Sequence, residues 1–256
     1  MDERFAGIDR LYGAGSAARL ARAHVAVVGL GGVGSWAAEA LARSGVGELT
    51  LIDADEVCVS NTNRQAHALE GEYGRAKVEV VARRLRAINP KLHVNALAEF
   101  VTSANLVALM ERGYDAVIDA CDALRIKVDM IAFCRRRKIP VIVSGSAGGR
   151  RDPTLITSRD LSKTEHDILL GLVRKKLRDE YGWTRNRKRY FGVQAVFSRE
   201  NVNYPQADGS VCKTRPADAE GAFKLDCSGG LGAAMHVTAT FGMVAAARTI
   251  ERVLDA

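Results

Sequence analysis

The feature that most constrains the fold is a glycine-rich turn between an apolar run and a helix-forming segment. Residues 24–28 are valine-rich, residues 29–34 form the turn, and residues 35–44 favour a helix. The glycines of the turn are Gly29, Gly31, Gly32 and Gly34. A strand, a glycine turn and a helix in this order bring backbone N–H groups close to a phosphate. The turn alone indicates only a nucleotide, since many dinucleotide enzymes contain it.

Strand-like and helix-like segments alternate as far as residue 145. We expect strands at residues 24–29, 48–53, 92–97, 114–119 and 140–144, and helices at residues 35–44, 74–89, 103–112 and 124–137. This alternation predicts a Rossmann-like α/β fold, a doubly wound and mostly parallel sheet with helices on both faces. A ligand then binds at the carboxyl ends of the strands.

The pattern becomes less regular after residue 149. We expect strands at residues 154–158 and 191–197, helices at residues 165–181 and 232–254, and a long irregular connection at residues 201–228. Residues 1–150 are therefore predicted to form a nucleotide-binding Rossmann-type domain. Residues 151–256 are predicted to form an irregular α+β extension with substrate and dimer elements, packed with that domain as one unit.

The composition is that of a soluble globular protein. Hydrophobic residues make up 47% and charged residues 26% of the 256 positions, and 37 basic against 30 acidic side chains give a net charge of +7. This excess permits a polyanionic partner. The five cysteines include no Cys-x-x-Cys pair, which argues against a disulfide framework or a compact zinc site. The charged N-terminus lacks an apolar signal core, so we expect a cytoplasmic protein.

One uncharged segment near the C-terminus has the length of a membrane span. No residue between Asp226 and Arg248 carries a formal charge, and about 20 apolar residues cross a bilayer. The segment contains Ser228, His236 and Thr240, and it is rich in alanine and glycine rather than in leucine. A buried helix or a subunit contact is therefore favoured over a membrane span. Peripheral membrane association stays open.

Charged residues downstream of the turn favour a triphosphate site over a nicotinamide site. Asp53 ends the second expected strand, where a carboxylate can accept hydrogen bonds from ribose hydroxyls. Arg64 and Lys77 supply the positive charges that a polyphosphate needs, and arginine binds phosphate oxygens in a fork. Asp119 and Asp122 lie at the end of another strand, and one of them could hold magnesium.

Each of these side chains also has a simpler interpretation. Lys77 on a helix can be a solvated surface charge, and Arg64 can cap a helix or pair with Asp55. Taken together, after a glycine turn in a βαβ unit, the residues favour phosphate binding. Asn61 and Gln65 could add neutral hydrogen bonds.

The order of these motifs resembles the E1-like adenylating family. The motifs that carry the resemblance are the glycine turn, Asp53-x-Asp55, Asn61-x-x-Arg64-Gln65, Lys77 and Asp119-x-x-Asp122. That family includes ubiquitin-activating enzymes and bacterial activators of sulfur-carrier proteins, and the resemblance covers about residues 25–145. It implies ATP binding with magnesium and adenylation of a carboxylate.

The same resemblance implies roles for individual residues. It implies that Gly32 lies against the phosphates and Asp53 on the ribose. Arg64 and Lys77 would bind phosphates, and Asp122 would serve magnesium and the reacting phosphate. The rest of the implied ATP-binding set is Gly29, Gly31, Gly34, Asp55, Asn61, Gln65 and Asp119.

An arginine near the N-terminus points to an assembly. Arg10 matches an arginine that, in the E1-like family, reaches the ATP of the partner subunit. The resemblance therefore implies a homodimer with composite sites. The implied catalytic group is Arg64, Lys77 and Asp122 from one subunit and Arg10 from the other.

A narrower resemblance covers nearly the whole chain. Residues 60–65, 134–140, 204–212 and 225–232 are similar to the tRNA threonylcarbamoyladenosine dehydratase family. This implies a tRNA substrate whose modified adenosine, beside the anticodon, carries a free threonine carboxylate. ATP would activate that carboxylate, and a ring would then close onto the carbamoyl group with overall loss of water.

A second function class shares the same ATP motifs. Activators of this kind adenylate the C-terminus of a small sulfur-carrier or ubiquitin-like protein. The sequence contains no Cys-x-x-Cys pair of the kind that binds their zinc, and we expect no appended sulfurtransferase domain. Both points favour the tRNA-modifying class. The sequence leaves open whether a cysteine-desulfurase or sulfur-acceptor partner docks here, and whether a monovalent cation binds in the C-terminal region.

Several basic runs could contact tRNA, and we favour the one beside aromatic residues. Residues 185–189 are strongly basic and follow Trp183, with Tyr190 and Phe191 directly after them. Aromatic rings next to cations suit the stacking of an unpaired base. The predicted tRNA-contacting residues are Arg185, Arg187, Lys188 and Arg189.

Cys227 is a tempting nucleophile, because E1-like enzymes often form a thioester. It lies before a glycine-rich stretch and a helix whose N-terminus could lower a thiol pKa. The favoured interpretation is a structural or merely adjacent thiol, because the carbamoyl nucleophile belongs to the substrate.

We therefore predict that a Cys227→Ala protein keeps substantial cyclisation activity, measured as conversion of modified tRNA. Near-total loss of activity with intact ATP binding would show that the thiol takes part in catalysis.

Overall fold

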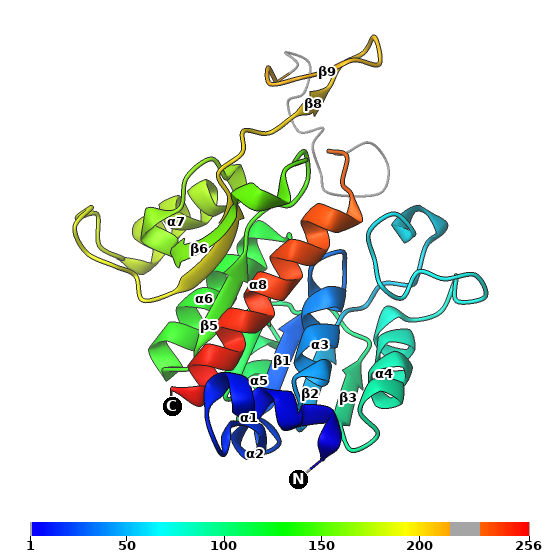
Figure 1. The fold of residues 1–256 in the computed structure, drawn as a ribbon. Helices are drawn as coiled ribbons and strands as arrows, with labels where there is room; N and C mark the ends of the chain where they lie inside the picture. The colour runs from blue at the N-terminus through cyan, green and yellow to red at the C-terminus, as the bar shows by residue number, and fades with distance from the viewer. Residues whose placement is uncertain (1, 216–230, 256) are drawn as a thin grey trace.

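A seven-stranded sheet with the order β3-β2-β1-β4-β5-β7-β6 organises the molecule (Figure 1). We describe it from a computed structural model, in which residues 2–215 and 231–255 are described. The strands are β1 His24–Val28, β2 Glu48–Ile52, β3 His93–Leu97, β4 Ala116–Asp119, β5 Val141–Ser144, β6 Ile156–Asp160 and β7 Gln194–Ser198. Neighbouring strands pair in parallel, except that β6 pairs antiparallel with β7. The predicted mostly parallel, doubly wound sheet is confirmed.

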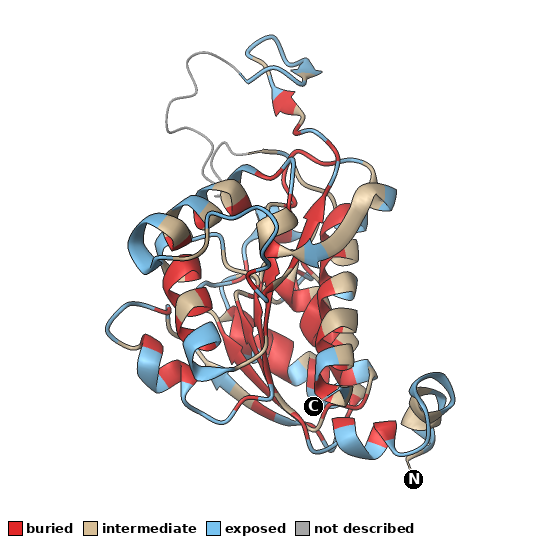
Figure 2. Ribbon diagram, turned by 90° about the vertical axis from the view of Figure 1, so that its left-hand side faces the viewer, coloured by how far each residue is buried: buried red, intermediate tan, exposed pale blue. Residues whose placement is uncertain are grey.

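Helices cover both faces of this sheet. They are α1 Ala6–Tyr12, α2 Ser16–Leu20, α3 Gly34–Arg43, α4 Lys77–Ile88, α5 Leu106–Met110, α6 Leu124–Arg137, α7 Ile168–Tyr181 and α8 Met235–Leu254. One apolar core joins the sheet to α3, α4 and α8, and a second joins it to α5, α6 and α7. Figure 2 shows buried strands and inward helix faces inside a shell of exposed outer faces. Strands β1 and β4 are almost wholly buried, as expected for a parallel sheet covered on both sides.

The element boundaries follow the sequence pattern closely in the first part of the chain. Helix α6 has the predicted bounds, whereas α4 begins three residues later and α5 is shorter than expected. The short helices α1 and α2 were not predicted, because 7 and 5 residues give too little periodicity. The segment expected to be irregular after residue 201 contains a small hairpin of β8 Tyr204–Pro205 and β9 Val211–Cys212.

The C-terminal helix α8 is a buried core helix, as the sequence analysis favoured. It packs along α3, and Val237, Phe241 and Ala245 are fully buried. Within the described ranges, no helix is both long and apolar enough to cross a membrane. Elements on both sides of residue 150 contribute to the same sheet and core. The division into residues 1–150 and 151–256 stays a prediction.

Gly242 allows the close contact between α8 and α3. A Cβ atom at this position would lie 2.6 Å from the carbonyl oxygen of Val33 and 2.9 Å from the amide nitrogen of Ala37. These neighbours are backbone atoms, which cannot rotate away. Gly171 in α7 offers a contrast, since a Cβ atom there would have its nearest neighbour at 3.9 Å, on the side chain of Arg174.

We predict that alanine has opposite effects at these two helical glycines. Gly242→Ala should lower the free energy of unfolding by about 1–3 kcal/mol through overpacking. Gly171→Ala should raise it by about 0.5–1 kcal/mol, because alanine favours the helix. Urea unfolding of both variants measures the two changes. Equal stabilisation by both substitutions would contradict the packing argument.

Candidate functional site

A cleft of about 720 Å³ opens at the carboxyl ends of β1, β2, β4 and β5. It is lined by the glycine turn, the loop at residues 60–65, the first residue of α4, the turn after β4, and residues 231–233 before α8. Because these segments come from distant parts of the chain, the cleft exists only in the folded protein. It lies where a doubly wound sheet binds its ligand.

The glycine turn is crowded on its sheet side and open toward the cleft. A Cβ atom on Gly29, which has a φ of +85°, would lie 2.9 Å from the carbonyl oxygen of Ala120. A Cβ atom on Gly34 would lie 1.8 Å from the carbonyl oxygen of Gly29. At Gly31 a Cβ atom would meet nothing within 4 Å. The glycine turn therefore fits tightly against the residues that follow β4 and leaves room for a phosphate at its outer surface.

Asp53 holds the glycine turn at the end of β2. Its carboxylate accepts the Leu30 N–H at 2.6 Å and the Asp55 N–H at 2.8 Å. Burial raises the pKa of Asp53, although Lys77 and the two N–H donors oppose this effect. The carboxylate lines the cleft and keeps further acceptor positions. Its contact with ribose remains a prediction.

Two cations predicted from the sequence converge on the cleft. Lys77 is 6% exposed, and its Nζ lies 2.8 Å from the Asp55 carboxylate. The interpretation of Lys77 as a solvated surface charge is therefore wrong, and it is Lys77 that pairs with Asp55. The Arg64 guanidinium donates to the Ser60 carbonyl at 2.8 Å and to Asn63 Oδ1 at 2.9 Å. Both cations line the same cavity and provide the positive field that a polyphosphate needs.

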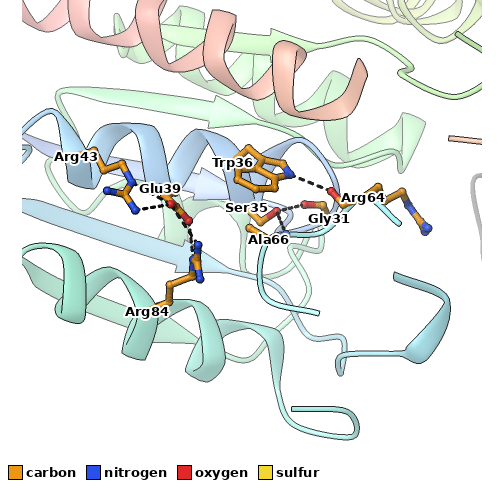
Figure 3. A network of polar contacts seen from close by, with 8 residues as sticks. All are labelled: Gly31, Ser35, Trp36, Glu39, Arg43, Arg64, Ala66 and Arg84. Atoms are coloured by element: carbon orange, nitrogen blue, oxygen red, sulfur yellow. Dashed lines mark hydrogen bonds and ion pairs between the residues drawn. The ribbon is translucent and has the colours of Figure 1, made fainter. Parts of the chain in front are cut away.

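The first turn of α3 fixes the loop that carries Arg64 (Figure 3). Trp36 Nε1 donates to the Arg64 carbonyl at 3.0 Å. Ser35 Oγ donates to the Gly31 carbonyl at 2.7 Å and accepts the Ala66 N–H at 3.4 Å. The glycine turn and the Arg64 loop are thereby held in one arrangement.

One helical turn further on, Glu39 joins α3 to α4. It is buried and accepts hydrogen bonds from Arg43 at 2.9 Å and from Arg84 at 2.6 Å (Figure 3). Burial opposes ionisation of Glu39, but the hydrogen bonds from Arg84 and Arg43 outweigh it and lower its pKa. This network fixes α4, and with it Lys77 at the start of that helix.

The two aspartates after β4 have different environments. Asp122 lines the cleft. Asp119 is fully buried, does not line the cleft, and lies 2.8 Å from the Nζ of Lys127. Asp119, which we predicted to contact the nucleotide, therefore lies outside the cleft lining, with its carboxylate directed toward Lys127 of α6. No group of three or more potential metal-ligating side chains occurs in the described part of the chain. One carboxylate together with phosphates suffices for magnesium, so Asp122 fits that ion.

The remaining predicted residues lie outside the cleft or outside the described ranges. Arg10 is exposed on α1, which packs on α2 near the C-terminal end of α8. Helix α8 begins at the cleft and its 20 residues span about 30 Å, so Arg10 cannot reach the cleft of its own subunit. Cys227 lies in residues 216–230, which the structure does not describe.

The basic loop predicted to contact tRNA follows α7. Arg185 pairs with Asp179 at 2.6 Å, and Lys163 donates to the carbonyl of Arg187. The side chains of Arg187, Lys188 and Arg189 are exposed. None of these residues lines the cleft, so any contact with tRNA would be a second one.

Comparison with known proteins identifies the family to which the chain belongs. The model of the ThiF family matches residues 6–253. The chain belongs to the ThiF family. It is 51% identical over 252 residues to the tRNA threonylcarbamoyladenosine dehydratase of Escherichia coli K12, covering 98% of this chain and 94% of that protein.

Solved structures of the E. coli dehydratase share the fold over the same range. The crystal structure with ATP has a TM-score of 0.86 and 46% identity, and covers 98% of this chain and 94% of that chain. The crystal structure with AMP has the same TM-score, 0.86, at 47% identity and the same coverage. The resemblance to the E1-like adenylating family and to its tRNA threonylcarbamoyladenosine dehydratases, which we stated from the sequence, is confirmed.

Lys127 is a buried residue behind the cleft that the sequence analysis missed. It is completely buried in α6 and contacts Asp119 directly behind the turn that carries Asp122. Its position three residues after Leu124 and four before Ile131, on an apolar helix face, was the available signal. Cys121 lines the cleft, but burial and Asp119 hold its thiol pKa well above the usual range, which disfavours a thiolate.

His67 is a second residue that the sequence analysis missed, and it lies behind the cleft. Its side chain is buried, and neither ring nitrogen has a hydrogen-bond partner among the described residues. Burial, together with the charges of Lys77 and Arg84, lowers the pKa of His67 to about 4. The imidazole is therefore neutral at pH 7.

We predict that His67 makes this fold sensitive to mild acid. Its folded pKa of about 4 lies below the unfolded value of about 6.5. The contribution of the neutral His67 side chain to the free energy of unfolding is complete at pH values above the unfolded pKa. It is lost as the pH falls, by about 2 kcal/mol between pH 7.5 and pH 5. In urea unfolding, His67→Phe should lose correspondingly less stability than wild type between these two pH values. An equal loss in both proteins would contradict this assignment.

Proposed function

We propose that this protein uses ATP to dehydrate and cyclise N6-threonylcarbamoyladenosine beside the anticodon of tRNA. The observation that carries the proposal is the likeness to the E. coli dehydratase along nearly the entire chain. The cleft supports it, because a glycine turn and two cations surround space for a triphosphate. Because the substrate is tRNA, we place the protein in the cytoplasm.

The proposed reaction has two steps that balance. An oxygen of the threonyl carboxylate attacks the α-phosphorus of ATP, and pyrophosphate leaves. The carbamoyl group then attacks the activated acyl carbon and loses a proton, and AMP leaves with the former carboxylate oxygen. The net result is a ring that contains one water fewer than the starting nucleoside. No nucleophile from the protein is required.

Side chains of the cleft have defined tasks in this scheme. Arg64 and Lys77 neutralise the polyphosphate, and Asp53 accepts from the ribose. Asp122 would hold magnesium, which supplies charge neutralisation when it is bound. Gln65 is buried in the cleft lining, and its Oε1 accepts no hydrogen bond from the described residues, so it is available to the nucleotide.

The proposed active unit is a homodimer. Arg10 is too far from its own cleft to act there, and it lies beside the exposed apolar side chains of Leu11 (72% exposed) and Tyr12 (38% exposed). We propose that this end of α1 docks on a second copy and delivers Arg10 to that copy's ATP. The described residues support no proposal for a monovalent cation or a sulfur-relay partner.

Mass spectrometry of tRNA treated with the purified protein tests the proposed function. With ATP, magnesium and tRNA carrying threonylcarbamoyladenosine, the nucleoside should lose one water while AMP forms. Lys77→Met, which keeps the buried volume, should lower the rate by about 10²-fold, as expected when one charged donor is removed. Lys91→Met, at an 80% exposed side chain beside β3, is the matched control and should act like wild type.

The same assay separates the two function classes. AMP formation with a small carrier protein, together with unchanged tRNA, would refute the dehydratase proposal in favour of a sulfur-carrier activator.

A further inference from the structure

A second cavity, of about 610 Å³, lies at the far end of α6. It is lined by the last turns of α6, the start of α5 and the loop that follows α7. We call it the aromatic pocket. Its aromatic lining consists of Phe133, Tyr181, Trp183, Tyr190 and Phe191.

Some of the aromatic rings in the pocket are buried, and others are exposed to solvent. Phe133 and Phe191 are buried, and Trp183 meets Phe191 edge to face, with ring centroids 4.8 Å apart. Tyr190 is 69% exposed and Tyr181 is 41% exposed. Large rings left open to solvent around a cavity indicate a binding site rather than a core.

The charge around the aromatic pocket is positive. Arg135 and Arg136 line it, and Arg187, Lys188 and Arg189 extend from the adjoining loop without an ion pair to any described residue.

The acidic groups nearby are already neutralised. Asp129 binds Arg125, Glu180 binds Arg125 and Lys176, and Asp179 binds Arg185. The net field at the aromatic pocket therefore favours a polyanion.

We infer that the aromatic pocket binds an unpaired nucleotide of the tRNA substrate, with its base stacked at Tyr190 and its phosphate near Arg136. Exposed aromatic rings combined with arginines are the usual means of holding single-stranded RNA. This inference rests on the proposed function, and it adds a second contact to that of the modified nucleoside.

The fold connects the two contact sites directly. The 14-residue helix α6 spans about 21 Å; Ala123 and Ile126 near its start line the cleft, and its last turns line the aromatic pocket. Residues 99–101 also line the cleft, and Ser103 lines the pocket. Phe100, one of these cleft-lining residues, is 64% exposed. The two sites therefore lie toward opposite ends of α6, within about one helix length of each other.

Binding of labelled tRNA at several salt concentrations tests this inference. Tyr190→Ala should weaken binding by roughly tenfold through the loss of one stacked base. Tyr190→Phe, which keeps the ring, should retain most of the affinity. Arg136→Glu should weaken binding and reduce the slope of log Kd against log salt by about one. Lys91→Glu, on the opposite edge of the sheet, should match wild type.

Ultraviolet crosslinking of the wild-type complex gives a readout that does not depend on folding of a variant. Crosslinked nucleotides should map to the peptide that contains Trp183 and Tyr190. If Tyr190→Ala and Arg136→Glu bind tRNA like wild type, or the crosslinks lie elsewhere, the inference is wrong while the dehydratase function stands. If these variants lose binding of a protein partner but not of tRNA, the pocket is a protein interface. Failure of the wild type to bind and convert tRNA would instead refute the proposed function.

Discussion

The close approach between the glycine turn and the turn after β4 is the constraint on which the rest of the site depends. Gly29 and Gly34 leave no room for a side chain, because Ala120 and the backbone of the turn itself occupy that space. Their lack of a Cβ atom lets β1, α3 and β4 meet at one point. Asp53 and Asp122 are brought to the same cleft as a consequence, although they follow different strands.

Electrostatic balance maintains this arrangement. Lys77 faces Asp55 in the cleft, and Lys127 faces Asp119 behind it. A buried charge without a partner would cost several kcal/mol, so each cation is matched before any ligand arrives. The exposed carboxylate of Asp55 leaves Lys77 open to competition from a phosphate. The Lys127 pair has no such exposure, and we interpret it as a support for the turn rather than as a participant in chemistry.

Much of the fold and part of the site could be predicted from the sequence, because their signals are local. Strand–helix alternation and the glycine turn gave the parallel sheet and the position of the cleft, and Arg64, Lys77 and Asp122 do line it. The orientation of Asp119 could not be predicted, since it depends on a lysine from a helix that packs behind the strand. The buried state of His67 depends likewise on packing between distant segments.

The contact of α8 with the Arg64 loop has a consequence for the integrity of the enzyme. Asn63 donates a hydrogen bond to the carbonyl of Ala233, which is 170 positions away in the sequence. Thr238 of α8 lies against Gly32, since a Cβ atom on that glycine would be 3.2 Å from the Thr238 side chain. Helix α8 and the residues just before it thus form one wall of the cleft, and a fragment without them would lack that wall as well as much of the core. Binding of a nucleotide in the cleft should therefore raise the free energy of global unfolding, and not only the stability of the loops around the cleft.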